Sequence, residues 1–113
     1  MTVAYVGDKT KEKVGPQTVI RHDSENGDTI LDLRPSQKLF NHSPDGFQFG
    51  YGGSGPAQLA LAILLDVTGD GEFSVRWHQT FKSEKIAGLE DRFIIIQSEV
   101  QDWVKARPTA GLY

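Results

Sequence analysis

Three residues whose side chains can carry nucleophilic or acid–base chemistry lie close together in the chain, at His42, Asp45 and Ser54. A histidine can exchange a proton with a carboxylate or activate a serine hydroxyl, provided that the loops bring the side chains together. Ser54 follows Gly52 as in the nucleophile elbow of α/β-hydrolases, but Pro56 stands where that motif has its second glycine. A small hydrolase or transferase is therefore the third of three hypotheses, and we predict no catalytic residue.

A glycine-rich segment precedes the most apolar part of the chain. Gly50, Gly52 and Gly55 match the spacing of a dinucleotide-binding loop, whose backbone N–H groups and helix N-terminus attract anions. Such a loop needs an acidic residue about 20 residues later, at the end of a second strand, whereas here a second helix is expected. The alternative function is therefore a looser site that captures a phosphate-bearing small molecule or nucleotide signal. Tight turns and close backbone approach are the preferred explanation of the glycines.

Metal and thiol chemistry find little support in the sequence. There is no cysteine, which excludes disulfides, thiolate zinc sites and a cysteine nucleophile. Segment 66–74 resembles the start of a calcium loop, but Trp77 occupies position twelve, where a bidentate carboxylate is required. His22, His42 and His78 are far apart in the sequence, with no carboxylate at ligand spacing. We expect no metal and no cofactor.

Composition restricts the class of partner. The 113 residues include 12 Lys+Arg and 15 Asp+Glu, a net charge of -3, and this even balance makes nucleic-acid binding a poor prediction. The longest nearly apolar run, 57–65, is far shorter than the roughly 20 residues that span a bilayer. With no secretory signal visible, we expect a cytosolic protein without a membrane partner. Segment 46–65 carries no charge at all, which indicates burial or contact with a partner.

The elements that must position these residues are predicted from hydrophobic period and turn chemistry. Alternation and β-branched residues predict strands at 3–6, 17–22, 29–33 and 92–97, with a short strand at 47–49 and a hairpin at Asn26-Gly27. An all-round apolar run predicts a buried helix from Ala57 to Val67. A second, amphipathic helix is expected over 72–89. Ser98 and Gln101 have the spacing of a capping box for a final helix.

Together these elements predict one α+β domain over residues 1–113. Antiparallel strands near the N-terminus pack on the buried central helix and on the amphipathic one. One further strand and a short terminal helix complete the domain.

Segment 41–60 carries the most specific pattern in the chain. From Ser43 to Gln58 it reads Ser-Pro-Asp-Gly-Phe-Gln-Phe-Gly-Tyr-Gly-Gly-Ser-Gly-Pro-Ala-Gln. This resembles a family of small bacterial and phage proteins of unknown function, in which a similar stretch leads into an apolar helix. Phe49 stands where tryptophan is usual, which keeps an aromatic ring and removes an indole donor. The resemblance implies a phage or mobile-element setting, where short proteins often bind and inhibit host machinery.

We therefore expect a non-enzymatic binding protein, such as a phage counter-defence inhibitor that acts through protein–protein contact. The expected partner is a bacterial protein, and the expected location is the cytoplasm of a bacterial cell. The oligomeric state is left open. The residues expected to bind the ligand or partner are Arg34, Asn41, His42, Ser43, Asp45, Tyr51, Gly52, Gly53, Ser54 and Gln58.

Overall fold

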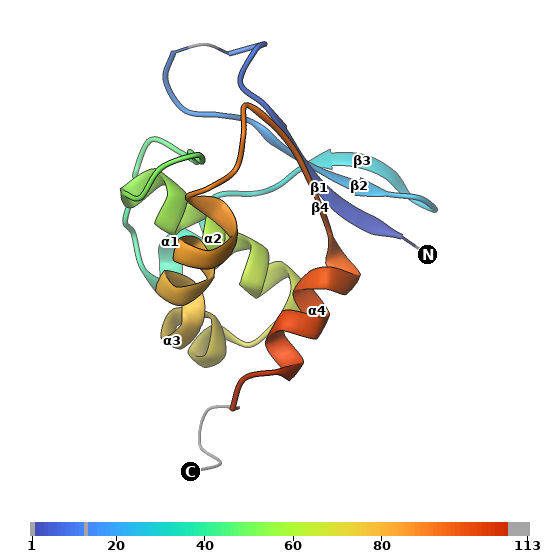
Figure 1. Ribbon diagram of the computed structural model, residues 1–113, viewed down its shortest axis with the longest axis vertical. Coiled ribbons are helices and arrows are strands. Elements are labelled where there is room, and N and C mark those ends of the chain that lie inside the picture. The colour runs from blue at the N-terminus through green and yellow to red at the C-terminus, as the bar shows by residue number, and fades with distance from the viewer. Residues whose placement is uncertain (1, 13, 109–113) are drawn as a thin grey trace.

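The computed structural model describes residues 2–12 and 14–108, which form a sheet with helices on one of its faces (Figure 1). The strands are β1 (Val3–Asp8), β2 (Val19–Asp23), β3 (Gly27–Ile30) and β4 (Arg92–Ile96). The helices are α1 (Arg34–Leu39), α2 (Ser54–Thr68), α3 (Gly71–Phe81), the π-helical turn η1 (Lys82–Ile86) and α4 (Gln97–Lys105). The predicted α+β class is thereby confirmed.

The sheet is antiparallel throughout, in the order β3-β2-β1-β4. The Asn-Gly hairpin prediction is confirmed, because β2 and β3 are joined by a turn and Gly27 has a φ of +91°. Asp23 holds that turn by accepting hydrogen bonds from the N–H groups of Glu25 and Asn26. These hydrogen bonds to the charged form lower the pKa of Asp23.

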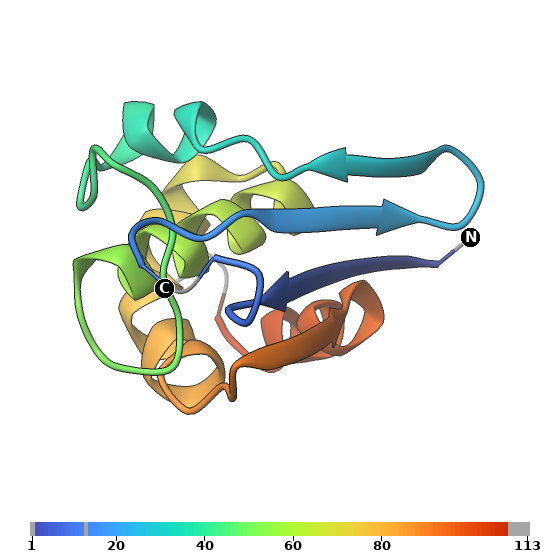
Figure 2. The same ribbon diagram turned by 90° about the horizontal axis from the view of Figure 1, so that it is seen from above.

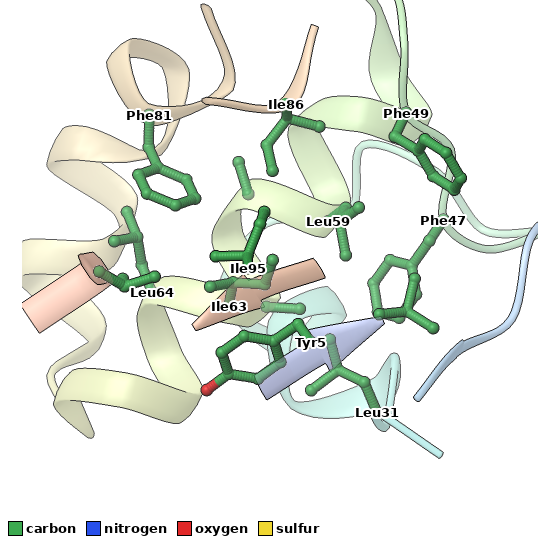
Figure 3. Close-up of a cluster of buried hydrophobic side chains, with 14 of the residues drawn as sticks. Tyr5, Leu31, Phe47, Phe49, Leu59, Ile63, Leu64, Phe81, Ile86 and Ile95 are labelled. Atoms are coloured by element: carbon green, nitrogen blue, oxygen red, sulfur yellow. The ribbon is translucent and has the colours of Figure 1, made fainter. Parts of the chain in front are cut away.

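The central helix α2 is the body around which the rest packs. Ten consecutive residues, from Gly55 to Leu64, are buried, as the all-round apolar pattern predicts. Sheet residues such as Tyr5 and Ile95 join Phe81 of α3 and Ile86 of η1 in one buried cluster with the side chains of α2 (Figure 3). Gly69 ends α2 in the left-handed conformation with φ +65°, close to the predicted end at Val67.

A polar cluster fastens the sheet to α2. The hydroxyl of Tyr5 donates to Oδ2 of Asp66 at 2.5 Å, and Nε of Arg21 donates to the same oxygen at 2.8 Å. Burial of the ring, followed by its hydrogen bond to the carboxylate, raises the pKa of Tyr5 above its ordinary value. Tyr5 is therefore a permanent donor that pins β1 to the last turns of α2.

Several predicted boundaries are wrong for local reasons. The strand predicted over 29–33 ends at Ile30, and the chain then enters α1, which was not predicted. Pro35 lies in the first turn of α1, where its missing N–H has no helical partner, so it starts a helix here and does not merely end a strand. Segment 47–49 is not a strand: one isolated bridge joins Phe47 to Gln17. Phe47 and Phe49 are nevertheless both buried.

The predicted helix caps differ as well. Ser98 lies inside α4, which begins directly after β4 with Ile96 at the cap position, so no capping box forms. Helix α2 begins at Ser54, three residues before the predicted start, with Gly53 at the cap position and no side-chain cap hydrogen bond. The helix expected over 72–89 is present as α3 followed by η1. Asp70 caps α3 by accepting from the N–H of Phe73, so the calcium-like segment serves as a helix stop and start.

We expect Gly55→Ala to destabilise the protein although alanine is the better helix former. A Cβ on Gly55 would lie 2.6 Å from Cβ of Gln48 and 3.1 Å from its backbone nitrogen, so segment 47–49 must move. Overpacking of this kind typically costs about 1–3 kcal/mol. The control is Gly52→Ala, where a Cβ would have no neighbour within 4 Å. Urea unfolding of both variants measures the difference, and equal stability would contradict the proposed close approach.

Candidate functional site

The candidate site is organised by Gln58, a fully buried polar residue in the first half of α2. Its Oε1 accepts from the backbone N–H of His42 at 2.7 Å and of Ser43 at 3.0 Å. Its Nε2 donates to Oγ of Ser36 at 2.9 Å and to the carbonyl of Phe40 at 3.1 Å. A primary amide has two donor hydrogens and two acceptor lone pairs, so all four of its hydrogen bonds are made.

Gln58 therefore fixes the conformation of the segment that follows α1. Three of its partners, the carbonyl of Phe40 and the N–H groups of His42 and Ser43, follow α1 outside any helix or strand. Buried backbone groups without partners are strongly disfavoured. The arrangement brings together three of the predicted site residues, His42, Ser43 and Gln58.

His42 meets a histidine that the sequence did not assign to the site. The two Nε2 atoms of His42 and His78 are 2.8 Å apart, and Nδ1 of His78 is 2.6 Å from the carbonyl of Val75. A carbonyl can only accept, so Nδ1 of neutral His78 carries the proton and its Nε2 is the acceptor. His42 is then the donor, with its proton on Nε2.

Burial keeps this pair neutral. Desolvation is the main reason that the pKa of both histidines lies below its ordinary value, and the nearby ammonium of Lys82 lowers both further. For His42 the neighbouring His78 acts in the same direction. No hydrogen bond in the described part of the chain joins His42 to Asp45 or Ser54, so the structure does not connect the acid–base set considered from the sequence.

The outer side of the histidine pair is an aromatic surface. The ring of Phe40 is stacked on that of His42, with centroids 4.1 Å apart and planes 10° from parallel, and it is 50% exposed. Leu39, also exposed, lies over Gly71 at the start of α3. We call Leu39, Phe40 and His42 the aromatic surface. Gln58 holds the backbone of Phe40 and His42, and His78 contacts the His42 ring, while the side chains of Leu39 and Phe40 are exposed.

Other predicted residues lie elsewhere. Asp45 and Arg34 line a groove of about 660 Å³ whose walls also include Gln17 and Leu31. There Arg34 is paired with Asp32. The Asp32 carboxylate accepts from the guanidinium of Arg34 at 2.9 Å and from the backbone N–H of Arg34 at 3.0 Å. Asn41 is exposed beside the aromatic surface.

The glycine-rich loop is largely explained by packing. Gly50 has a φ of +86° and donates its N–H to the carbonyl of Ile86 at 3.0 Å, while Gly55 approaches Gln48 closely. Exposed residues complete the loop, namely Tyr51, Gly52 and Ser54, together with the partly exposed Gly53. Nζ of Lys9 donates to the carbonyl of Phe49 and lies 5.7 Å from the centroid of the Tyr51 ring. The phosphate-binding interpretation remains a prediction from the sequence.

No metal centre is formed within residues 2–12 and 14–108, where no three His, Asp or Glu side chains cluster as ligands. In the same ranges no helix is both long and apolar enough to cross a membrane. The sequence pointed to Gln58, a polar side chain within an apolar helix, but missed Ser36, Phe40 and His78. Those three contacts arise between segments well separated in sequence, and no local pattern encodes them.

The fold and the site define a class of protein: a small α+β domain with helices on one face of an antiparallel sheet and a glycine-rich loop that leads into a buried helix. The chain belongs to a family of unknown function, DUF6166, which it matches over residues 5–106. This confirms the expected membership in a family of unknown function. Comparisons with curated proteins and with solved structures give no match.

We predict that Gln58→Leu lowers the free energy of unfolding by about 2–4 kcal/mol, because it leaves the N–H groups of His42 and Ser43 without an acceptor. Gln79→Leu, on the exposed side of α3, is the matched control and should change stability little. Chemical denaturation followed by tryptophan fluorescence measures both. A Gln58→Leu protein as stable as the control would contradict the organising role of the amide.

We also predict that stability falls as the pH is lowered from about 7 towards 5. His42 and His78 have pKa values in the folded protein below the value of about 6.5 in the unfolded chain. The two histidines therefore contribute fully to the free energy of unfolding at pH values above their pKa in the unfolded chain. This contribution is lost as the pH falls, because the unfolded chain binds protons that the folded protein does not. The measurement is the free energy of unfolding against pH. His42→Gln/His78→Gln should flatten that dependence, whereas Gln79→Leu, at an exposed position on α3, should leave it in place.

Proposed function

We propose that this protein acts without catalysis, by binding another protein through the aromatic surface of Leu39, Phe40 and His42. The observation that carries the proposal is the half-exposed ring of Phe40, stacked on His42 above a hydrogen-bonded and buried base. Binding energy at protein interfaces concentrates in a few aromatic anchors, and rigid anchors lose little conformational entropy on binding. A solvent-exposed ring held in one orientation meets both requirements.

A hollow beside the aromatic surface supports the same proposal. It is an open depression of about 890 Å³ between the end of α1 and the first turns of α3, lined by Leu39, Gly71, Glu72, Val75 and Arg76. The carbonyl of Val75 accepts from Nδ1 of His78, so α3 contributes residues both to this depression and to the histidine pair. A partner that covers Phe40 can place an apolar side chain in this depression, with Glu72 and Arg76 at the rim.

The setting of the proposal comes from the resemblance of segment 41–60 to small bacterial and phage proteins. It supports a bacterial protein as the partner and inhibition of host defence as the outcome. Of the contact residues predicted from the sequence, His42 belongs to the aromatic surface, Asn41 and Ser43 adjoin it, and Gln58 holds the backbone beneath it.

The test is a photo-crosslinking amino acid at position 40, compared with the same amino acid at position 14, where Val14 is 92% exposed and outside the surface. Expressed in bacteria, the first protein should form a discrete crosslinked adduct that the second does not. The captured protein, once purified, should bind the wild type in calorimetry and bind Phe40→Ala at least about tenfold more weakly, as is usual for a central anchor. Tyr51→Ala should bind like the wild type. Adducts of equal yield at positions 40 and 14 would contradict the proposal.

A further inference from the structure

The face of the sheet that points away from the helices carries an apolar row. Directly paired residues in an antiparallel sheet share a face, and Val6 pairs with both Ile20 and Ile94, while Ile20 pairs with Ile30. The row Ile30–Ile20–Val6–Ile94 therefore crosses all four strands. Tyr5, one position along, is buried against α2, so this row faces the opposite way. Figure 2 looks onto this face, which no helix of the described chain covers.

The row is unusually exposed for its chemistry. Ile30 and Ile94, at its two ends, are each 68% exposed, and Ile20 and Val6 between them are partly exposed. In the next row on the same face, Ile96 is also exposed. The solvent face of an antiparallel sheet normally carries polar residues, and contiguous exposed apolar surface marks an interaction site. We call this row, with Ile96, the isoleucine face.

We propose that the isoleucine face binds a second copy of this chain, sheet against sheet, about a two-fold axis parallel to the strands. Such an axis places β3 of one copy over β4 of the other, and β2 over β1. Ile30 then lies over Ile94 of the second copy, and Ile20 over Val6 of the second copy. The two outer residues of the row are equally exposed and the two inner ones are both partly exposed. The face is therefore complementary to itself, as a two-fold interface requires.

The charges around the row fit a second copy. On one side His22 and Asp28 form a pair with Nδ1 and Oδ1 2.5 Å apart, and on the other Arg92 and Asp8 form a pair at 3.4 Å. Arg92 neutralises Asp8, and the two-fold axis places Asp28 over Ile96 of the second copy and not over a second Asp28. Two identical faces can therefore approach without like-charge repulsion, which is costly at interfaces. An apolar centre with a polar rim is also the usual anatomy of a protein interface. A partner with a strongly charged surface would meet no complementary charge on this face.

The size of the face sets the expected strength. Four strands about 4.8 Å apart, each about five residues of 3.3 Å, have a footprint of roughly 300 Å². Specific interfaces typically bury about 800 Å² of accessible surface on each partner. The contact is therefore small, and we expect a weak dimer in concentration-dependent exchange with the monomer. This inference uses residues other than those of the aromatic surface and does not rest on the proposed function.

The test is analytical ultracentrifugation of the full chain over a wide range of concentration. The wild type should pass from monomer to dimer, and Ile30→Lys and Ile94→Glu should each weaken dimerisation at least about tenfold, because each buries an unpaired charge. The double variant Ile30→Lys/Ile94→Glu should recover part of the loss, since the two-fold axis brings the new ammonium over the new carboxylate of the other copy. Val14→Lys, at an exposed position off the sheet, is the control and should dimerise normally. Circular dichroism verifies that each variant is folded.

Three results would overturn this inference. A wild type that stays monomeric at every concentration excludes the dimer. A dimer that depends on Ile94 but not on Ile30 indicates edge-to-edge pairing of β4, because Ile30 lies on the far edge strand. A dimer weakened by Phe40→Ala and unaffected by both isoleucine variants indicates association through the aromatic surface.

Discussion

The structure depends on the requirement that a buried amide must make all of its hydrogen bonds. Gln58 is fully buried in an otherwise apolar helix, and its four partners lie in the segment from Ser36 to Ser43. The last residues of that segment, from Phe40 to Ser43, follow α1 outside any helix or strand, and the carbonyl of Phe40 and the N–H groups of His42 and Ser43 pair with Gln58. Gln58 thus supplies the hydrogen bonds that a helix or strand would otherwise provide to these backbone groups, and these bonds set the positions of Phe40 and His42. A polar residue that serves the fold also presents the surface that we assign to binding.

Close backbone approach is the second constraint, and it explains the concentration of glycine in segment 46–55. Gly46 and Gly50 adopt positive φ values, +141° and +86°, that suit glycine. Gly55 lets the first turn of α2 lie against Gln48, which in turn directs Phe47 and Phe49 into the core (Figure 3). The same glycines that resemble an anion-binding loop are thus required by the packing of aromatic residues on α2.

The parts of this structure that sequence reasoning could predict are those fixed by local chemistry. The apolar run of α2, the isoleucines of β4 and the Asn-Gly turn each carry their own signal. Helix α1 has no apolar period over its six residues, so hydrophobic pattern does not reveal it, and Ser36 within it is held by the distant Gln58. The contact of His42 with His78 joins residues 36 positions apart, and only tertiary packing creates it.

Strand β4 shows how an apparent mismatch between sequence and fold becomes informative. Its residues Phe93 to Ile96 are all apolar, a pattern typical of a strand that is covered on both faces. Phe93 and Ile95 are buried under the helices, whereas Ile94 and Ile96 remain exposed on the other face. If solvent were the permanent neighbour of that face, alternation with polar residues would cost the fold nothing. The continuous apolar pattern, matched by Ile30 at the opposite edge of the sheet, is typical of a sheet face that packs against another protein layer.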